Sequence, residues 1–178
     1  MATKNAYCSF CGTAFPQDLP WPRTCAACGR TGYLNPLPVA VMVLPVDDGV
    51  LVVRRDVEPH RGGLALPGGY VDLGESWQQA AVRELREETG VVVEADAVGL
   101  FDVISAPDGT ILIFALGPRV ALDGLPPMRA TAETSEWLII DGPADLAFTL
   151  HSQVVAAYFG QAGAPRAEKD QAMPRKGR

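Results

Sequence analysis

The sequence lacks the features of a membrane or exported protein. Its longest uninterrupted apolar run, Val39 to Leu44, is far shorter than the roughly 20 residues of a membrane-spanning helix. No basic, then apolar, then small-residue signal pattern opens the chain. With 48% hydrophobic residues, the composition is that of a globular protein. We therefore expect a cytoplasmic protein that does not enter a membrane.

Positive charge is scarce in most of the chain. Ten Lys or Arg residues face nineteen Asp or Glu residues before Gln161, whereas the segment from Gln161 onward has five basic and two acidic residues. Nucleic-acid affinity comes largely from phosphate neutralisation by Lys and Arg, so this balance argues against nucleic acid as a partner and suits divalent cations. The charged, Ala-, Gly- and Pro-rich segment 161–178 is predicted to be a disordered tail.

Cysteine is also rare, and its four copies form two Cys-x-x-Cys motifs, each followed by glycine: Cys8, Cys11, Cys25 and Cys28. Thiolates at this spacing can close a tetrahedral zinc site, and glycine permits the tight turn after each motif. Two disulfides or a redox-active pair are the alternatives, but the expected compartment and the doubled motif favour zinc. We predict a structural zinc ribbon over residues 1–34, folded largely by its metal because it can bury little apolar surface.

The main domain is predicted over residues 35–160, after the stiff connector Asn35 to Pro38. The β-branched runs 39–46 and 50–54, separated by Asp47-Asp48-Gly49, predict a hairpin. His151 is interpreted as a helix-start or packing residue. Further expected elements are strands at 64–66, 98–104, 111–116 and 137–140, a loop over 117–136, a helical turn over 143–146 and a helix over 151–159.

The most informative segment reads GYVDLGESWQQAAVRELREETGV, from Gly69 to Val91. Within it, a helix is predicted to start after Ser76, because Ser76 and Gln79 can form a capping box. The helix is predicted to end at Gly90, since glycine readily takes the left-handed conformation of a helix end. The loop Pro67-Gly68-Gly69 precedes it and allows close backbone approach to a bound group.

Three carboxylates of this helix are expected on one face. At about 100° per residue, Glu84, Glu87 and Glu88 point the same way, beside an apolar stripe of Ala81, Val82 and Leu85. Like charges this close resist joint ionisation, and a hard divalent cation removes the conflict. Oxygen-only ligands suit Mg²⁺ or Mn²⁺. The alternative is a solvated face with charge pairs.

The same segment resembles the Nudix box at every fixed position: Gly69, Glu75, Arg83-Glu84-Leu85, Glu87-Glu88, Gly90 and Val91. The resemblance implies an α/β fold, the Nudix α/β/α sandwich with a mixed sheet, here preceded by the four-cysteine ribbon. It implies hydrolysis of the diphosphate bond in a nucleoside diphosphate linked to another group. It further implies that Glu84, Glu87, Glu88 and the Gly69 carbonyl bind catalytic metal, and that Arg83 orients glutamates, with Glu75 as its partner.

The remaining roles are expectations of the same resemblance. Candidates for the general base are Glu88, Glu133 and Glu136. Candidates for gripping substrate phosphates or a base, together with the loop glycines Gly68 and Gly69, are Arg54, Arg55, His60 and Arg61. Ordinary surface charge is the alternative for each of these cations.

A ribbon before a Nudix domain resembles the NADH pyrophosphatase and ADP-ribose pyrophosphatase branch. The Ser-Gln-Pro-Trp motif of that branch does not follow Val91, so ADP-ribose, NADH and nucleotide sugars all stay open as substrates. One alternative is an RNA-cap-directed hydrolase or a nucleic-acid-binding module, for which the ribbon offers only Lys4, Arg23 and Arg30. Another is isoprenoid diphosphate isomerisation, which needs a cysteine in the catalytic domain, where the chain has none. A homodimer, as in many relatives, stays open.

Overall fold

The computed structural model describes residues 4–162, and the chain divides into two compact units, Met1–Leu37 and Pro38–Arg178. We describe each unit by itself. Within the described residues, neither helix has the length and apolar character needed to cross a bilayer. Most of the segment predicted as a disordered tail, residues 163–178, lies outside the described residues.

The first unit consists of two similar knuckles and a short hairpin of β1 (Arg23–Thr24) and β2 (Thr31–Gly32). In each knuckle the first cysteine donates its N–H to the carbonyl five residues later, Thr13 or Arg30, at 2.8 and 2.9 Å. The glycine after the second cysteine, Gly12 or Gly29, donates back to the first cysteine and has a positive φ of 75° or 69°. The two Cys-x-x-Cys motifs therefore share one backbone geometry.

The second unit is built on two four-stranded sheets. One has the order β7-β3-β9-β8, formed by Gly68–Tyr70, Leu37–Val43, Thr110–Leu116 and Gly99–Ser105. The other has the order β10-β5-β4 with β6 beside β5, formed by Thr134–Ile140, Gly49–Arg55, Pro45–Val46 and Leu64–Ala65. A parallel bridge between Val46 and Val120 mixes the strand directions.

The chain passes from the first sheet to the second between β3 and β4, at Leu44 and Pro45. Pro45 has no N–H to donate to a ladder, so a strand is readily interrupted there. This break explains why the predicted run 39–46 forms strands in two sheets. The connected hairpin to β5 is present as predicted, and Leu51 N–H donates to the Leu44 carbonyl at 3.0 Å.

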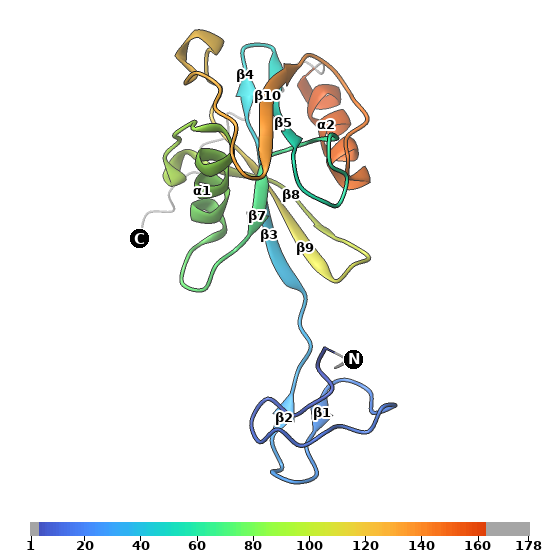
Figure 1. Cartoon of the computed structure of the whole chain (residues 1–178). Coiled ribbons are helices and arrows are strands. Elements are labelled where there is room, and N and C mark those ends of the chain that lie inside the picture. Colours follow the sequence, from blue (N-terminus) through green and yellow to red (C-terminus); the bar gives the residue numbers. More distant parts are fainter. Residues whose placement is uncertain (1–3, 163–178) are drawn as a thin grey trace, which may run out of the picture. The chain divides into compact units, whose positions relative to one another are not determined.

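Strand alternation divides the apolar core into two clusters, one on each face. Ala40, Met42 and Leu44 pack with Ala81 and Leu85 of helix α1 (Trp77–Thr89). On the other face, Val41, Val43, Val50 and Val52 of the strands pack with Val154 and Val155 of helix α2 (Thr149–Ala162). Successive side chains of a strand point to opposite faces, so each helix covers one face (Figure 1). The predicted α/β/α sandwich is confirmed.

Three elements differ from the sequence-based expectation. Strand β10 begins at Thr134, so the last three residues of the predicted loop 117–136 pair with β5. The predicted helical turn over 143–146 is wrong: these residues form no helix or strand, and the Leu146 N–H donates to Ser152 Oγ at 2.8 Å. Two short 3₁₀ helices were also not predicted: η1 (Ala95–Ala97) lies before β8, and η2 (Leu122–Gly124) lies within the loop 117–136.

Candidate active site

Hydrogen bonds at its two ends determine where helix α1 begins and where it stops. Ser76 N–H donates to Gln79 Oε1 at 2.7 Å, and Gln79 N–H donates to Ser76 Oγ at 3.2 Å, which completes the predicted capping box. At the other end, Gly90 has φ of 78° and its N–H reaches the Arg86 carbonyl at 2.8 Å. Both ends of the helix that carries the glutamates are thereby fixed.

Arg83 is the centre of an ion-pair network beside this helix. Its guanidinium pairs with Glu75 through Nε–Oε2 at 3.2 Å and Nη2–Oε1 at 2.7 Å, the partner expected from the sequence. Its Nη1 reaches Glu84 at 2.7 Å and Glu87 at 3.3 Å, and its Nη2 donates to the Tyr70 carbonyl at 2.9 Å. The hydrogen bond from Arg83 lowers the pKa of Glu75. Five donors in a rigid fork suit arginine to this role.

The face of α1 that carries the glutamates borders a cleft of about 620 Å³. The loop around β7 forms a second wall, and residues just before β10 form a third. The lining residues are Gly68, Gly69, Tyr70, Asp72, Arg83, Glu84, Glu87, Glu88, Thr131, Ala132 and Glu133. Seven of the residues predicted for the site from the sequence therefore meet in one place.

Burial leaves the cleft carboxylates short of compensating charge. Desolvation, followed by the nearby Glu84 carboxylate, raises the pKa of Glu88 to about 8. Desolvation also raises the pKa of Glu84, although its ion pair with Arg83 acts in the opposite direction. Glu88 Oε2 is buried with no hydrogen-bond partner. A buried oxygen without a partner costs free energy unless another group satisfies it.

The donor set fits a hard divalent cation on two further observations. A Cβ on Gly69 would overlap the Glu84 carboxylate, so glycine keeps open the space between this loop and the helix. The carboxylates along the cleft offer oxygen atoms, the ligand type that Mg²⁺ and Mn²⁺ take. Glu84, Glu87 and Glu88 would be the side chains that hold such an ion.

These three carboxylates do not form a compact group of metal ligands like that of the cysteines. Within residues 4–162, one group of three or more such side chains has all its ligand atoms within 4.8 Å of one another, and it consists of the four cysteines. The carboxylates of Glu84 and Glu87 both pair with Arg83, whereas that of Glu88 does not. The three glutamates share the cleft but not a closed cage.

The predicted substrate cations lie outside the lining of this cleft. Arg54 pairs with Glu136 at 2.6 Å, so a predicted base and a predicted substrate contact bind each other. Arg61 pairs with Asp56 at 2.8 Å on the surface. The Arg55 guanidinium lies 5.0 Å from the centre of the Phe148 ring. Its charge slightly opposes the rise in the pKa of Glu88. Their roles stay predictions.

The sequence reasoning missed two groups near the site. Tyr70 and Asp72 line the cleft, and their place inside the box was the available signal. His151 on α2 is buried and accepts a hydrogen bond through Nδ1 from the Leu66 N–H at 3.2 Å, next to the loop Pro67-Gly68-Gly69. No local pattern indicated this contact, because its partners are 85 residues apart.

A sandwich with a carboxylate-bearing helix facing a glycine loop defines the class of Nudix-type folds. The family model for the NUDIX domain matches residues 36–154, and the chain belongs to the Nudix family. The match covers the whole second unit up to the second turn of α2.

Comparison with individual proteins gives more specific relatives. The chain is 38% identical over 76 residues to an ADP-ribose pyrophosphatase of Methanocaldococcus jannaschii, covering 43% of this chain and 44% of that protein. It is 31% identical over 92 residues to the NAD-capped RNA hydrolase NudC of Escherichia coli, covering 51% and 35%. The aligned region thus spans less than half of either relative. A Nudix hydrolase structure from Nitrosomonas europaea shares the fold, with a TM-score of 0.66, 24% identity, and coverage of 90% of this chain and 94% of that one.

Proposed function

We propose that this protein hydrolyses the diphosphate bond of a nucleoside diphosphate linked to another group, with ADP-ribose as the leading substrate and NADH and nucleotide sugars as alternatives. The supporting observation is the buried, partnerless Glu88 oxygen in a cleft shared with Glu84 and Glu87. The likeness to an ADP-ribose pyrophosphatase supports the choice of first substrate. The cleft of about 620 Å³ is of the size that small-molecule sites have.

The chemistry is an in-line displacement by water. Mg²⁺ or Mn²⁺, when bound there, would supply Lewis-acid activation of water and phosphoryl oxygens. A new bond forms between the water oxygen and phosphorus, and the anhydride P–O bond breaks, so ADP-ribose gives AMP and ribose 5-phosphate. The proton of the attacking water passes to a carboxylate.

The chain's own residues divide this work. Glu84, Glu87 and Glu88, with the Gly69 carbonyl, would hold the cation, and Arg83, itself paired with Glu75, positions Glu84 and Glu87. Glu133 lines the cleft, whereas Glu136 is paired with Arg54, so Glu133 is the better-placed proton acceptor of the two.

For the first unit we propose a structural Zn²⁺ bound by Cys8, Cys11, Cys25 and Cys28. A tetrahedral site with Zn–S bonds of about 2.3 Å places sulfur atoms about 3.8 Å apart. The Sγ atoms of Cys8 and Cys28 are 3.8 Å apart, and those of Cys11 and Cys25 are 3.6 Å apart. These separations support zinc over disulfides, whose sulfurs lie about 2.05 Å apart. Four thiolates leave no position for water, so the ion would not be catalytic.

The substrate is tested by incubating the purified protein with Mg²⁺ or Mn²⁺ and separate substrates. The panel contains ADP-ribose, NADH, nucleotide sugars, isopentenyl diphosphate and NAD-capped RNA, with products separated by HPLC. We expect AMP and ribose 5-phosphate from ADP-ribose. An absence of turnover on every diphosphate would contradict the proposal, and isomerised isopentenyl diphosphate would replace it. Sedimentation of the same sample measures whether the protein is a monomer or a homodimer.

The metal assignment is tested by Glu87→Gln. The Glu87 side chain is about half exposed, so the substitution leaves the fold intact while it removes a charged oxygen ligand. We expect turnover to be abolished at an unchanged melting temperature. Glu94→Gln makes the same change at an exposed position outside the cleft and serves as the control. Full activity of Glu87→Gln would remove this residue from the metal site.

A second candidate activity is hydrolysis of NAD-capped RNA, and the relative NudC supports it. It predicts that capped RNA is turned over with a higher kcat/KM than free NADH. The reverse order would restrict the protein to small molecules.

A further inference from the structure

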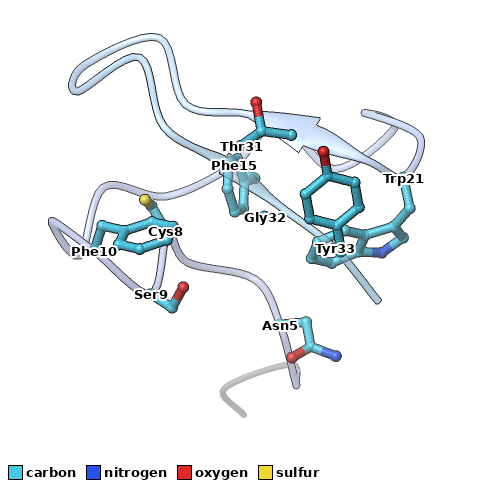
Figure 2. A pocket seen from close by; sticks show the side chains of 9 residues that line it. All are labelled: Asn5, Cys8, Ser9, Phe10, Phe15, Trp21, Thr31, Gly32 and Tyr33. Atoms are coloured by element: carbon cyan, nitrogen blue, oxygen red, sulfur yellow. The ribbon is translucent and has the colours of Figure 1, made fainter. Parts of the chain in front are cut away.

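The first unit carries a pocket that the proposed hydrolysis does not use. Its volume is about 310 Å³, and four aromatic side chains line it: Phe10, Phe15, Trp21 and Tyr33. Asn5, Ser9 and Thr31 add polar groups to its wall. In Figure 2, Trp21 and Tyr33 lie toward one end of the pocket and Phe10 toward the other.

Two of these rings are open to solvent. Tyr33 is 68% exposed and Phe10 is 53% exposed. The residues that the unit buries are Cys8 and Cys25, so the exposed rings are not its core. Exposed aromatic rings that gather at one pocket are more informative than single exposed apolar residues, because such patches mark interaction sites.

Arginine side chains lie over the same rings. The Arg23 guanidinium carbon is 4.6 Å from the Trp21 ring centre and 5.5 Å from that of Phe15. Its Nε donates to the Leu19 carbonyl at 2.6 Å and its Nη1 to the Asn5 carbonyl at 3.2 Å, which fixes its position. Arg30 lies 4.9 Å over Phe10. Neither arginine forms an ion pair with any residue in the range 4–162.

Apart from its cysteines, the charged side chains of this unit are mostly basic, whereas those of residues 38–160 are mostly acidic. Lys4, Arg23 and Arg30 face a single acid, Asp18, in residues 4–37, whereas acids predominate between residues 38 and 160. A site that presents exposed aromatic rings together with guanidinium groups that form no ion pair suits a partner with flat bases and negative charge. Single-stranded nucleic acid has both, and its bases stack on such rings with little sequence preference.

We propose that this aromatic pocket binds an unpaired base of single-stranded RNA, with the adjacent phosphates near Arg23 and Arg30. The amide and hydroxyl groups of Asn5, Ser9 and Thr31 offer partners for a ribose 2′-hydroxyl, so RNA is the preferred strand over DNA. Zinc with four thiolates carries two formal negative charges, so stacking supplies most of the affinity. The salt dependence is correspondingly shallow, with a slope of log K against log salt of about −1 to −2 for two cations on a single strand.

The test measures fluorescence anisotropy of a labelled single-stranded RNA of mixed sequence with the full-length, zinc-loaded protein. Tyr33→Ala is expected to weaken binding between about fivefold and a hundredfold, the effect of losing one base stack. Arg30→Ala is expected to reduce the salt slope by about 1. Leu34→Ala is the matched control, because Leu34 is exposed at the neighbouring position but does not line the pocket. Zinc content is measured for every variant to establish that the knuckles remain folded.

Several results would overturn the proposal: no binding, equal binding by Tyr33→Ala, or equal binding of double-stranded RNA, whose bases cannot stack on the rings. Tighter binding of single-stranded DNA would overturn the choice of RNA. A dimer that dissociates in Tyr33→Ala and binds no RNA would assign the pocket to a second copy of the chain. ADP-ribose hydrolysis is expected to be unchanged in all three variants, so the binding assay and the activity assay can fail independently.

Discussion

The two units of this protein achieve a stable fold by different physical means. Among residues 4–37, the buried positions are two cysteines, and four sulfur atoms stand where an apolar core would be. The second unit buries two clusters of aliphatic side chains, one under each helix. A unit of about 120 residues can bury enough apolar surface to be stable, whereas one of about 35 residues cannot. The smaller unit therefore depends on its proposed metal.

The same contrast applies to how each unit uses oxygen or sulfur ligands. The cysteines already lie at the separations of a tetrahedral site, held by matching backbone hydrogen bonds. The glutamates line a cleft without closing a cage, and one of their oxygens lacks a partner. A closed set is what a structural ion needs, and an open set leaves room for substrate and water. The geometry of the two ligand sets is thus consistent with the structural ion proposed for the cysteines and the catalytic ion proposed for the glutamates.

The largest effect is expected from removing one sulfur. Cys25→Ser takes a buried ligand from the zinc site, and the binding free energy that folds such units is about 10–16 kcal/mol. We expect zinc content to fall to near zero and the first unit to lose its NMR dispersion, while ADP-ribose hydrolysis persists. Elemental analysis, NMR and the activity assay measure the three outcomes.

Ala27→Ser changes an exposed residue in the same knuckle and is the control, expected to keep its zinc. If Cys25→Ser also unfolded the second unit, the stabilities of the two units would be coupled and the comparison would break.

The next largest effect compares one substitution in both units. Phe114→Ala removes a fully buried ring from the cluster under α2 and is expected to destabilise the second unit by about 3–5 kcal/mol. Phe10→Ala removes a half-exposed ring from the first unit and is expected to cost less than about 1 kcal/mol. Urea unfolding, followed by probes specific to each unit, measures both. Equal costs would mean that the ribbon has an apolar core after all.

An intermediate effect concerns pH. Burial, and then the charge of Arg55, lower the pKa of His151 to about 4, whereas an unfolded histidine titrates near its ordinary value of about 6.5. Between these values the unfolded chain binds the proton more readily, so stability that is present above pH 6.5 is lost as pH falls toward 4. The loss is on the order of 3 kcal/mol.

His151→Asn sharpens this prediction, because its Oδ1 can accept the Leu66 N–H while the titrating ring is absent. Urea midpoints at pH 7 and pH 4.5 should differ less in the variant than in the wild-type protein. His60→Asn is the control, since His60 is exposed. Identical pH profiles for His151→Asn and the wild-type protein would show that other groups cause the acid sensitivity.

The sequence predicted the contacts that form between residues close to one another in the chain. The cap of α1, its glycine end and the pairing of Arg83 with Glu75 involve residues at most eight positions apart, and all three are present. The two knuckles are local in the same sense. Short-range patterns suffice where a contact forms within one turn or loop.

What it could not predict depends on partners distant in the chain. The Arg54–Glu136 pair joins residues 82 positions apart through the β5–β10 ladder, and this ladder also extends β10 back to Thr134. The irregular segment 143–146 is held by Ser152 and, through the next residue, by Leu64, whose carbonyl accepts from the Ala147 N–H at 2.7 Å. Tertiary contacts override local propensity at such positions.

The smallest effect on stability tests a predicted substrate contact of the second unit. Arg61 and Asp56 form an exposed ion pair, and such pairs contribute about 0–1 kcal/mol, so Arg61→Ala should hardly change the free energy of unfolding. The KM for ADP-ribose should nevertheless rise severalfold at unchanged kcat, because a cation that binds substrate phosphate equally in ground and transition states affects binding alone. Arg119→Ala removes another exposed arginine of the same unit and should leave KM unchanged. If both variants keep the wild-type KM, Arg61 does not contact the substrate and contributes only surface charge to the second unit.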